Sequence, residues 1–266
     1  MMGFNHILYE KRDSVLRVTI NHPERHNSLD DECWQELADA FEEADTDGEI
    51  GVIVLTGAGD KAFCAGGYLK DLAEFEREKS RRMFRTSARA FHAMRKARQP
   101  VIGAVNGYAI GGGNEVVVAC DLAIASEHAI FAQVGPSVGS SPIFGGTNLL
   151  ALSIGEKRAK EVCMMNRRYT AEEACQLGWI NKVVPHAELY DEVERWCQTL
   201  LDRSPAYLEL TKVSSNVWWD MMQQAYSHGE QVLMRLAGGP DMLEGTQSFM
   251  EKRKPNFRQF RPKTSS

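Results

Sequence analysis

The segment Pro100–Asp121 limits the possible folds of this chain more than any other. Its first part, Val101–Ile110, is apolar and rich in β-branched residues, which predicts a buried strand. Three glycines follow at Gly111–Gly113, and Asn114–Cys120 has the composition of a short helix. Glycines at a strand-to-helix turn allow positive φ angles and let another molecule approach the backbone closely. The free N–H groups at the start of such a helix can stabilise an oxygen that becomes anionic during a reaction.

Glu115 falls in the first turn of the expected helix and places a carboxylate beside these N–H groups. On its own, the segment fits a plain tight turn with a favourable first-turn acid just as well. A second small-residue loop, Phe63–Lys70, also precedes a helix-like run. Two such turns suggest a pair of backbone donors that converge on one carbonyl oxygen, which is an oxyanion hole for an acyl group.

Composition excludes several classes of function. The chain has 266 residues, 43% hydrophobic and 25% charged, as in globular proteins, and its net charge of -5 argues against a general affinity for nucleic acid or anionic membrane. We expect no signal peptide and no membrane span. The six cysteines are scattered without a C-x-x-C pair, which favours reduced thiols in a cytoplasmic protein. The seven histidines lack the short spacings of metal-binding motifs, so no metal is expected.

One rival hypothesis arises at Gly57–Ala62. The sequence G-x-G-x-x-A after an expected strand, Gly51–Thr56, has the spacing of a dinucleotide-binding fingerprint. That fingerprint requires a helix to begin at its second glycine, and the loop Phe63–Gly67 interrupts any such helix. We therefore expect no Rossmann-type nucleotide site.

The expected strands and helices alternate over roughly the first 200 residues, which favours an α/β fold. A helix is predicted over Ser28–Ala44, with Ser28 as its N-cap. Two separate helices are predicted at Glu74–Arg89 and Ser87–Ala97. From Pro205 onwards the chain is predicted to be helical, and such a tail usually serves packing or oligomerisation.

With both glycine loops, the chain resembles the crotonase (enoyl-CoA hydratase/isomerase) superfamily. The similarity runs in order and spacing from about Leu8 to Phe260, and its motifs are specific as a set although each is weak alone. They are the two glycine loops and four further short segments: Ala62–Lys70, Asn106–Glu115, Cys120–Asp121, Gly146–Thr147, Ala171–Gly178 and Phe249–Phe257.

The resemblance implies a spiral of ββα units in residues 1–203, forming an acyl-CoA-binding core. Residues 204–266 would form a helical C-terminal region that mediates homotrimers, usually paired into hexamers. The implied substrate is a coenzyme A thioester, with no permanently bound cofactor, as in fatty or aromatic acid metabolism.

The resemblance also assigns roles to residues by position. The oxyanion-hole amides fall on Gly67 and Gly112, and Glu115 matches the first of the two glutamates that hydratases use. Coenzyme A would lie along the first glycine loop, with one arginine near its phosphates and one lysine reaching over from a neighbouring subunit. These binding residues are Arg25, Ala65, Gly66, Tyr68, Leu69, Lys70 and Lys252.

The loop after the second glycine turn departs from the hydratases. Their second glutamate would fall at Gly135, so this carboxylate is absent. The loop Gln133–Ser140 resembles a subgroup with 1,4-dihydroxy-2-naphthoyl-CoA synthase and 2-ketocyclohexanecarboxyl-CoA hydrolase, which share a Gln-x-Gly-Pro-x-x-Gly-Ser pattern. Those enzymes have an aspartate where this chain has Pro142, and they tend to lack an acid at the position of Glu115.

Three hypotheses follow. The first is an enoyl-CoA hydratase or lyase with Glu115 as acid/base, in which loop residues position substrate or water: Gln133, Gly135, Ser137, Ser140 and Ser141. The second is carbon–carbon chemistry, namely a hydrolase, synthase or decarboxylase acting on a β-keto, malonyl-type or cyclic acyl-CoA. The third is a non-catalytic acyl-CoA-binding homologue. Further side chains that could shape the acyl pocket, each also compatible with a plain core role, are Cys64, Tyr68, His92 and Tyr108.

Overall fold

The protein folds around two β-sheets of different size. The structure is a computed structural model and describes residues 3–69 and 77–261. The helix-like run expected next to the loop Phe63–Lys70, from Leu69 to Phe75, therefore lies largely outside the described residues. Within these ranges no helix combines the length and apolar character needed to cross a bilayer.

The larger sheet has six strands. An antiparallel hairpin at its edge turns through Asp13 and Ser14, both at positive φ. The strands, in sheet order and parallel from the second onwards, are β1 (Ile7–Arg12), β2 (Val15–Ile20), β3 (Val52–Gly57), β5 (Val101–Val105), β7 (Leu122–Ser126) and β10 (Lys182–Val184). The two central strands β3 and β5 are buried along their whole length because helices cover both faces of the sheet.

The smaller sheet carries the two glycine turns. Its strands are β4 (Ala62–Cys64), β6 (Tyr108–Ile110), β8 (Ile130–Ala132) and β9 (Tyr169–Thr170). The sequence predicted one strand over Val101–Ile110, and this is wrong, because the chain crosses between sheets at Asn106. The Asn106 side-chain amide donates to the carbonyls of Gly57 (2.9 Å) and Gly59 (2.7 Å), which holds the crossing point.

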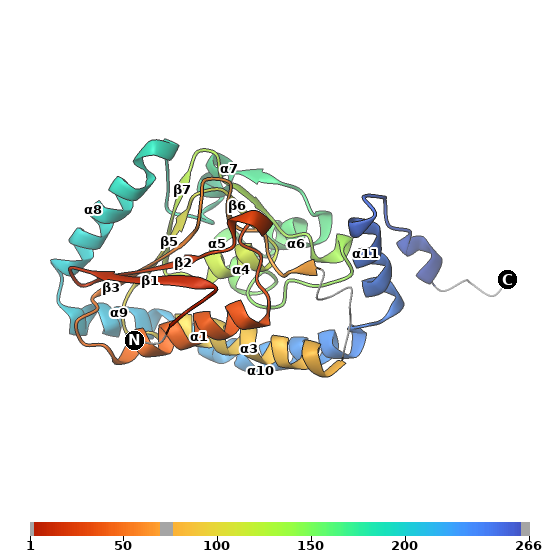
Figure 1. Ribbon diagram of the computed structural model, residues 1–266, viewed down its shortest axis with the longest axis horizontal. Coiled ribbons are helices and arrows are strands. Elements are labelled where there is room, and N and C mark those ends of the chain that lie inside the picture. The colour runs from red at the N-terminus through yellow and green to blue at the C-terminus, as the bar shows by residue number, and fades with distance from the viewer. Residues whose placement is uncertain (1–2, 70–76, 262–266) are drawn as a thin grey trace.

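Two long helices, α1 (Asp31–Thr46) and α3 (Arg77–Lys96), pack side by side below the sheets (Figure 1). The N-cap of α1 is Asp30, whose carboxylate accepts from Cys33 N at 2.8 Å, so the predicted Ser28 cap is wrong. Residues before Asp30 are instead held extended by a bridge between Leu29 and Gly67. The two helices predicted between Glu74 and Ala97 are one continuous helix where the structure describes them.

The remaining helices complete the layers. Helix α8 (Leu189–Leu201) covers one face of the larger sheet, opposite α1 and α3 (Figure 1). The other α-helices of the core are α4 (Gly112–Ala119), α5 (Leu149–Ile154), α6 (Glu156–Met165) and α7 (Ala171–Leu177). Short 3₁₀ segments occur at Pro23–Arg25, Gly135–Ser137, His186–Glu188 and Phe257–Phe260.

The C-terminal region is helical, as expected, with α9 (Pro205–Ser215), α10 (Val217–Leu236) and α11 (Pro240–Met250). Helix α10 runs along α3, and α11 forms one end of the molecule (Figure 1). The buried ammonium of Lys212 fixes α9 to the core by bonding Asp121 Oδ2 (2.7 Å) and the carbonyl of Gln99 (2.9 Å). The expected boundary at residues 203/204 falls between α8 and α9.

Candidate active site

The two glycine turns meet because they follow neighbouring parallel strands of the smaller sheet. β4 and β6 pair in parallel, so their carboxyl ends, where ligands bind in open α/β sheets, lie at one edge. Gly111 adopts a φ of 56°, which only glycine tolerates easily, and Gly112 begins α4. A Cβ on Gly66 would lie 3.1 Å from Gly112 N, and one on Gly112 would lie 3.6 Å from Gly67 N.

The amides of Gly67 and Gly112 are both available to a ligand. Gly112 is the first residue of α4, so its N–H has no acceptor within the helix. Leu29 bonds the backbone on either side of Gly67, since Leu29 N donates to Gly66 O (2.8 Å) and Tyr68 N donates to Leu29 O (2.9 Å). This parallel bridge turns the N–H of Gly67 itself away from Leu29. Two adjacent donors of this kind can bind one carbonyl oxygen and stabilise negative charge on it.

Glu115 is buried next to these donors. Its side chain is almost fully enclosed (5% exposed), and burial raises the pKa of its carboxyl to about 8, against the opposing effect of the Gly146 and Phe144 amides. The contact from Gly146 N to Glu115 Oε1 is long, at 3.5 Å. A carboxyl with this pKa can both accept and release a proton near neutral pH.

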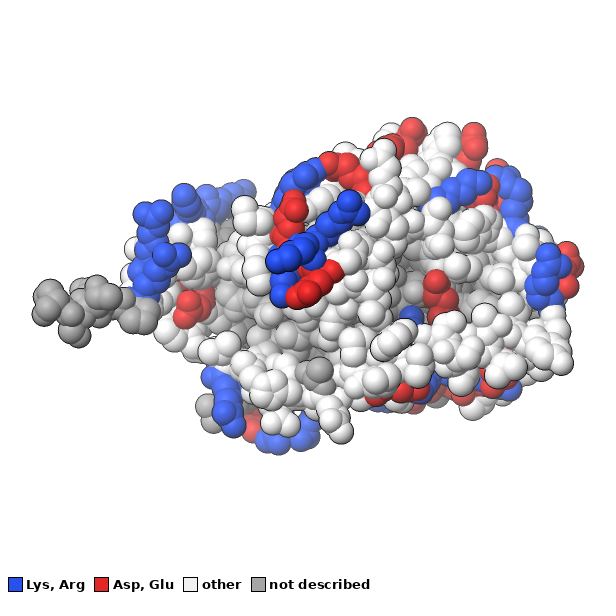
Figure 2. Space-filling model, turned by 180° about the vertical axis from the view of Figure 1, so that it is seen from behind, with Lys and Arg blue, Asp and Glu red and all other residues white. Residues whose placement is uncertain are grey.

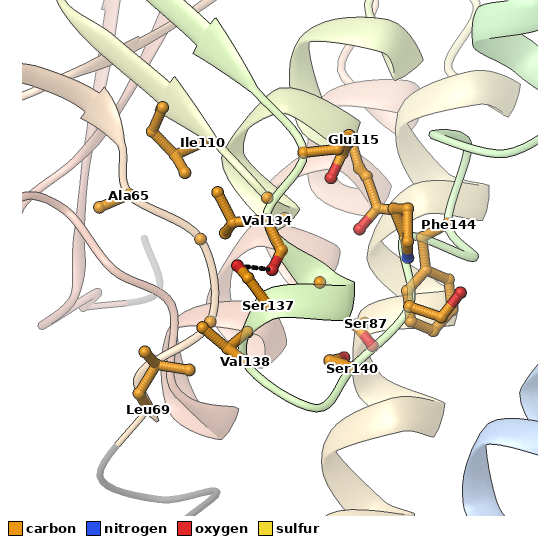
Figure 3. A pocket seen from close by; sticks show the side chains of 18 of the residues that line it. Ala65, Leu69, Ser87, Ile110, Glu115, Val134, Ser137, Val138, Ser140 and Phe144 are labelled. Carbon is orange, nitrogen blue, oxygen red and sulfur yellow. Dashed lines mark hydrogen bonds between the residues drawn. The ribbon is translucent and has the colours of Figure 1, made fainter. Parts of the chain in front are cut away.

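Glu115 and both glycine turns line one cavity of about 590 Å³. Figure 3 shows Ala65 and Leu69 on one side, Val134–Val138 in the middle, and Glu115 beside Phe144 on the other. The lining is mostly apolar and includes side chains from α3 and from the C-terminal helices: Met83, Phe84, Ser87, Leu233 and Phe249. Such a cavity suits a molecule with an apolar group and one polar centre.

The loop residues proposed to position substrate or water all line this cavity: Gln133, Gly135, Ser137, Ser140 and Ser141. The hydroxyl of Ser137 already donates to Val134 O at 2.7 Å (Figure 3), so its partner is the loop itself. Gln133 differs, because it is fully buried and neither polar atom of its side chain has a hydrogen-bond partner in the described part of the chain. A buried amide of this kind is suited to binding a ligand or a water molecule.

The space where the second hydratase glutamate would stand is filled by backbone. A Cβ on Gly135 would lie 2.9 Å from Ser140 O and 3.1 Å from Ser141 Cα. Ser140 N also donates to Gly135 O at 2.8 Å, which holds the loop in this closed form. Apart from Glu115, no carboxylate lines the cavity among residues 3–69 and 77–261.

The residues predicted to bind coenzyme A divide into three groups. Ala65, Gly66 and Leu69 line the cavity. Arg25 and Tyr68 lie outside the lining and contact each other, with the guanidinium 4.7 Å from the centre of the ring. Arg25 is also ion-paired with Asp30. Two predicted residues are not placed near the cavity by this chain alone: Lys252 is exposed after α11, and Lys70 lies outside the described residues.

Of the further side chains expected to shape the acyl pocket, Tyr108 lines the cavity, whereas Cys64, Tyr68 and His92 do not. Burial raises the pKa of the Cys64 thiol to about 12, so this thiol is poorly suited to act as a nucleophile.

Sequence reasoning missed Phe144, which lines the cavity, and Tyr226, which is not part of the lining but packs against Phe144 with ring centres 6.3 Å apart. The hydroxyl of Tyr226, from α10, is buried without a partner in the described residues, and its pKa is raised by burial and by the charge of Glu115. Neither residue belongs to a motif, so no sequence signal could have identified it.

Comparison with known proteins agrees with this geometry. The sequence model of the family described as Enoyl-CoA hydratase/isomerase matches residues 10–261. An enoyl-CoA hydratase structure from Mycobacterium avium subsp. paratuberculosis is 30% identical, with a TM-score of 0.85 over 96% of this chain and 99% of that one. An enoyl-CoA hydratase from Bacillus anthracis is 31% identical, with a TM-score of 0.78 over 95% and 99%. A carnitinyl-CoA hydratase from Mycobacterium avium is 28% identical, with a TM-score of 0.83 over 96% and 98%.

The match extends over nearly the whole chain and over the fold as well as the sequence. It confirms the crotonase-type α/β fold that the glycine motifs suggested, and it supports a transformation of acyl-CoA thioesters. The chain belongs to the enoyl-CoA hydratase/isomerase family, the crotonase superfamily.

Proposed function

We propose that the protein is a lyase that adds water to an enoyl-CoA thioester or removes it, with Glu115 as its acid/base. The observation that carries this proposal is a buried carboxyl with a pKa of about 8 in the same apolar cavity as the amides of Gly67 and Gly112. The two amides would bind the thioester oxygen and stabilise the enolate that forms when the β-carbon is attacked.

In this mechanism a single carboxylate transfers one proton. Ionised Glu115 accepts a proton from water while the hydroxide adds to the β-carbon of the substrate. The protonated Glu115 then donates this proton to the α-carbon as the enolate collapses, so one water molecule is added overall. Gln133 would hold the water in place of a second carboxylate, because its amide is buried and unpartnered in the described structure.

The coenzyme A part of the substrate would follow the first glycine loop, with Arg25 near the phosphates and no permanently bound cofactor. We further propose a homotrimer or a pair of trimers, in which Lys252 reaches the coenzyme A of a neighbour. Residues 252–261 contain five Lys and Arg, and Figure 2 shows basic side chains gathered beside the C-terminal tail, as phosphate binding requires. An enzyme of this class, with reduced cysteines, fits the cytoplasm.

The second candidate is carbon–carbon chemistry on a β-keto, malonyl-type or cyclic acyl-CoA. It is favoured by two observations, the backbone that fills the space beside Gly135 and the presence of Arg168 in the cavity lining. A guanidinium there could pair with a carboxylate of the acyl group or with a bound bicarbonate. Dependence of the rate on added bicarbonate would favour this candidate over hydration.

Incubation with a panel of saturated, unsaturated, β-keto, malonyl-type and cyclic acyl-CoA thioesters, followed by mass spectrometry, tests the proposal. Hydration predicts that an unsaturated thioester gains the mass of one water. Release of carbon dioxide from a malonyl-type ester, or ring opening of a cyclic β-keto ester, would contradict hydration and support the second candidate. No turnover of any thioester, with binding retained, would indicate a non-catalytic acyl-CoA-binding protein.

A further inference from the structure

Three segments that are distant in sequence bring two histidines and an aspartate together outside the cavity. His6 precedes β1, His22 follows β2, and Asp30 caps α1. One ligand atom from each side chain lies within 4.8 Å of the other two. His6 Nδ1 is 2.8 Å from His22 Nε2 and 3.6 Å from Asp30 Oδ1. The spacings of 16 and 8 residues match no metal motif, which explains why the sequence predicted no metal site.

These distances fit the coordination sphere of a transition metal. In a tetrahedral site with metal–ligand bonds of about 2.0–2.1 Å, two ligand atoms stand about 3.3 Å apart. The observed separations of 2.8 and 3.6 Å lie on either side of this value, so a small rotation of the rings suffices. The side chains are also mostly enclosed, with exposures of 25% for His6, 16% for His22 and 10% for Asp30.

The surroundings already orient these side chains. His22 Nδ1 lies 3.2 Å from a carboxylate oxygen of Glu24, which is the outer partner that a metal-binding imidazole usually has. The Glu36 carboxylate accepts a hydrogen bond from the backbone N–H of His6 at 2.7 Å, and Asn27 Oδ1 accepts one from the backbone N–H of His22 at 3.0 Å. Asp30 is fixed by its cap bond to Cys33 N.

Arg25 does not block this arrangement. Its guanidinium bonds Asp30 Oδ2, whereas the oxygen that faces His6 is Oδ1, which keeps a free lone pair after its bond from Cys33 N. The positive charge of Arg25 is balanced by Asp30, and Glu24 adds a second negative charge beside His22. A dication at the centre would therefore meet a locally acidic site.

We propose that His6, His22 and Asp30 bind a divalent transition-metal ion of the Zn²⁺ or Co²⁺ class, with one coordination position open to water. Two imidazole nitrogens and one carboxylate oxygen are ligands that suit these ions. The bound ion would join β1, the loop after β2 and the start of α1. The loop after β2 supports the backbone around Gly67 in two places. His26 O accepts from Ala65 N at 2.9 Å, and Leu29 forms backbone hydrogen bonds with Gly66 and Tyr68. The ion would thus stabilise the base of the first glycine loop.

Titration of the untagged, metal-free full chain with Co²⁺, followed by visible absorption, tests this site. We expect one equivalent to bind with ligand-field bands of nitrogen and oxygen ligation and without the intense near-ultraviolet absorption of thiolate ligation. His22→Ala and His6→Ala should each abolish these bands, and Glu24→Gln should weaken binding about 10–100-fold. His128→Ala, which removes an exposed histidine elsewhere, should bind Co²⁺ as the wild type does.

A second measurement does not depend on the folding of the variants. Zn²⁺ at saturating concentration should raise the Tm of the wild-type protein, because an ion that binds only the folded state stabilises it. Failure of the wild type to bind Co²⁺, or equal binding by wild type and His22→Ala, would overturn the proposal. The 2.8 Å contact would then be a plain hydrogen bond between two histidines beside an ion pair.

Discussion

Glu115 should make the stability of the folded protein depend on pH. Its pKa is raised from 4.5 to about 8, so the folded state binds this proton more tightly than the unfolded state does. The stability that this proton provides is present below pH 4.5 and is lost as the pH rises towards 8, by at most about 1.4 kcal/mol per pH unit. Urea unfolding of wild type and Glu115→Gln at several pH values measures this difference.

Glu115→Gln keeps all the other titrating groups of the protein, so the difference between it and wild type isolates the effect of Glu115. The free energy of unfolding of wild type, relative to Glu115→Gln, should fall steadily across this interval. A constant difference between the two proteins would show that Glu115 keeps an ordinary pKa in the folded state.

Gly135 should not accept a glutamate that restores the hydratase pattern. Its Cβ would stand 2.9 Å from the Ser140 carbonyl, and backbone cannot withdraw as the end of a flexible side chain can. Gly135→Ala should therefore cost about 1–3 kcal/mol of stability, as overpacking usually does. Gly3→Ala, where a Cβ meets nothing within 4 Å, is the matched control for thermal unfolding. A Gly135→Glu protein that is both stable and more active would contradict this description of the loop.

At the scale of elements, Lys212 should be essential for the attachment of α9 to the core. Lys212→Ala would remove the ammonium from Asp121 and from the Gln99 carbonyl. Asp121 keeps its bond from Val101 N, so the cost should be about 3 kcal/mol, the lower part of the range for a broken buried ion pair. The surface pair of Lys160 and Glu156 is the control, since Lys160→Ala should cost less than about 1 kcal/mol. Equal midpoints of denaturant unfolding for the two variants would refute the anchoring role.

Most elements could be predicted from local patterns, and the errors have physical causes. Ser28 has the properties of an N-cap, but the pairing of Leu29 with Gly67 keeps the chain extended there and moves the cap to Asp30. The run from Val101 to Ile110 is apolar except at Asn106 and Gly107, and the hydrogen bonds of Asn106 to a distant turn divide it there into two strands. Tertiary contacts decided both cases.

The candidate site was predictable where it depends on motifs. The two glycine turns and Glu115 could be located from the residues themselves, because strand-to-helix turns with free N–H groups have a chemical signature. The choice of Gly67 and Gly112 as the two donors came from the resemblance to the crotonase superfamily. Phe144 and Tyr226 could not be located from the sequence, because Phe144 reaches the cavity, and Tyr226 packs behind it, only through the packing of the loop after β8 against helix α10. Packing between distant elements leaves no local pattern in a sequence.

For the whole molecule, we expect the C-terminal helices to mediate the proposed self-association. Large apolar side chains on α9 and α10 are exposed at 55–71%, namely Tyr207, Leu210, Val213, Trp218 and Met221. Exposed apolar surface of this extent marks interaction sites. We expect light scattering to give the mass of a trimer or hexamer, and Leu210→Asp with Val213→Asp to reduce it. Gln198→Asp on α8 should leave the mass unchanged, and a monomeric wild type would contradict the proposed assembly.

In the proposed reaction Glu115 transfers the proton while the amides of Gly67 and Gly112 stabilise the enolate. The most direct test compares kcat and thioester Kd for wild type, Glu115→Gln and the exposed control Glu194→Gln. For the thioester that the wild type converts, kcat of Glu115→Gln should fall by about 10²–10⁴-fold, the usual contribution of a general acid/base, while the Kd stays within about threefold. Glu194→Gln should match wild type. A Glu115→Gln enzyme with unchanged kcat would contradict the mechanism.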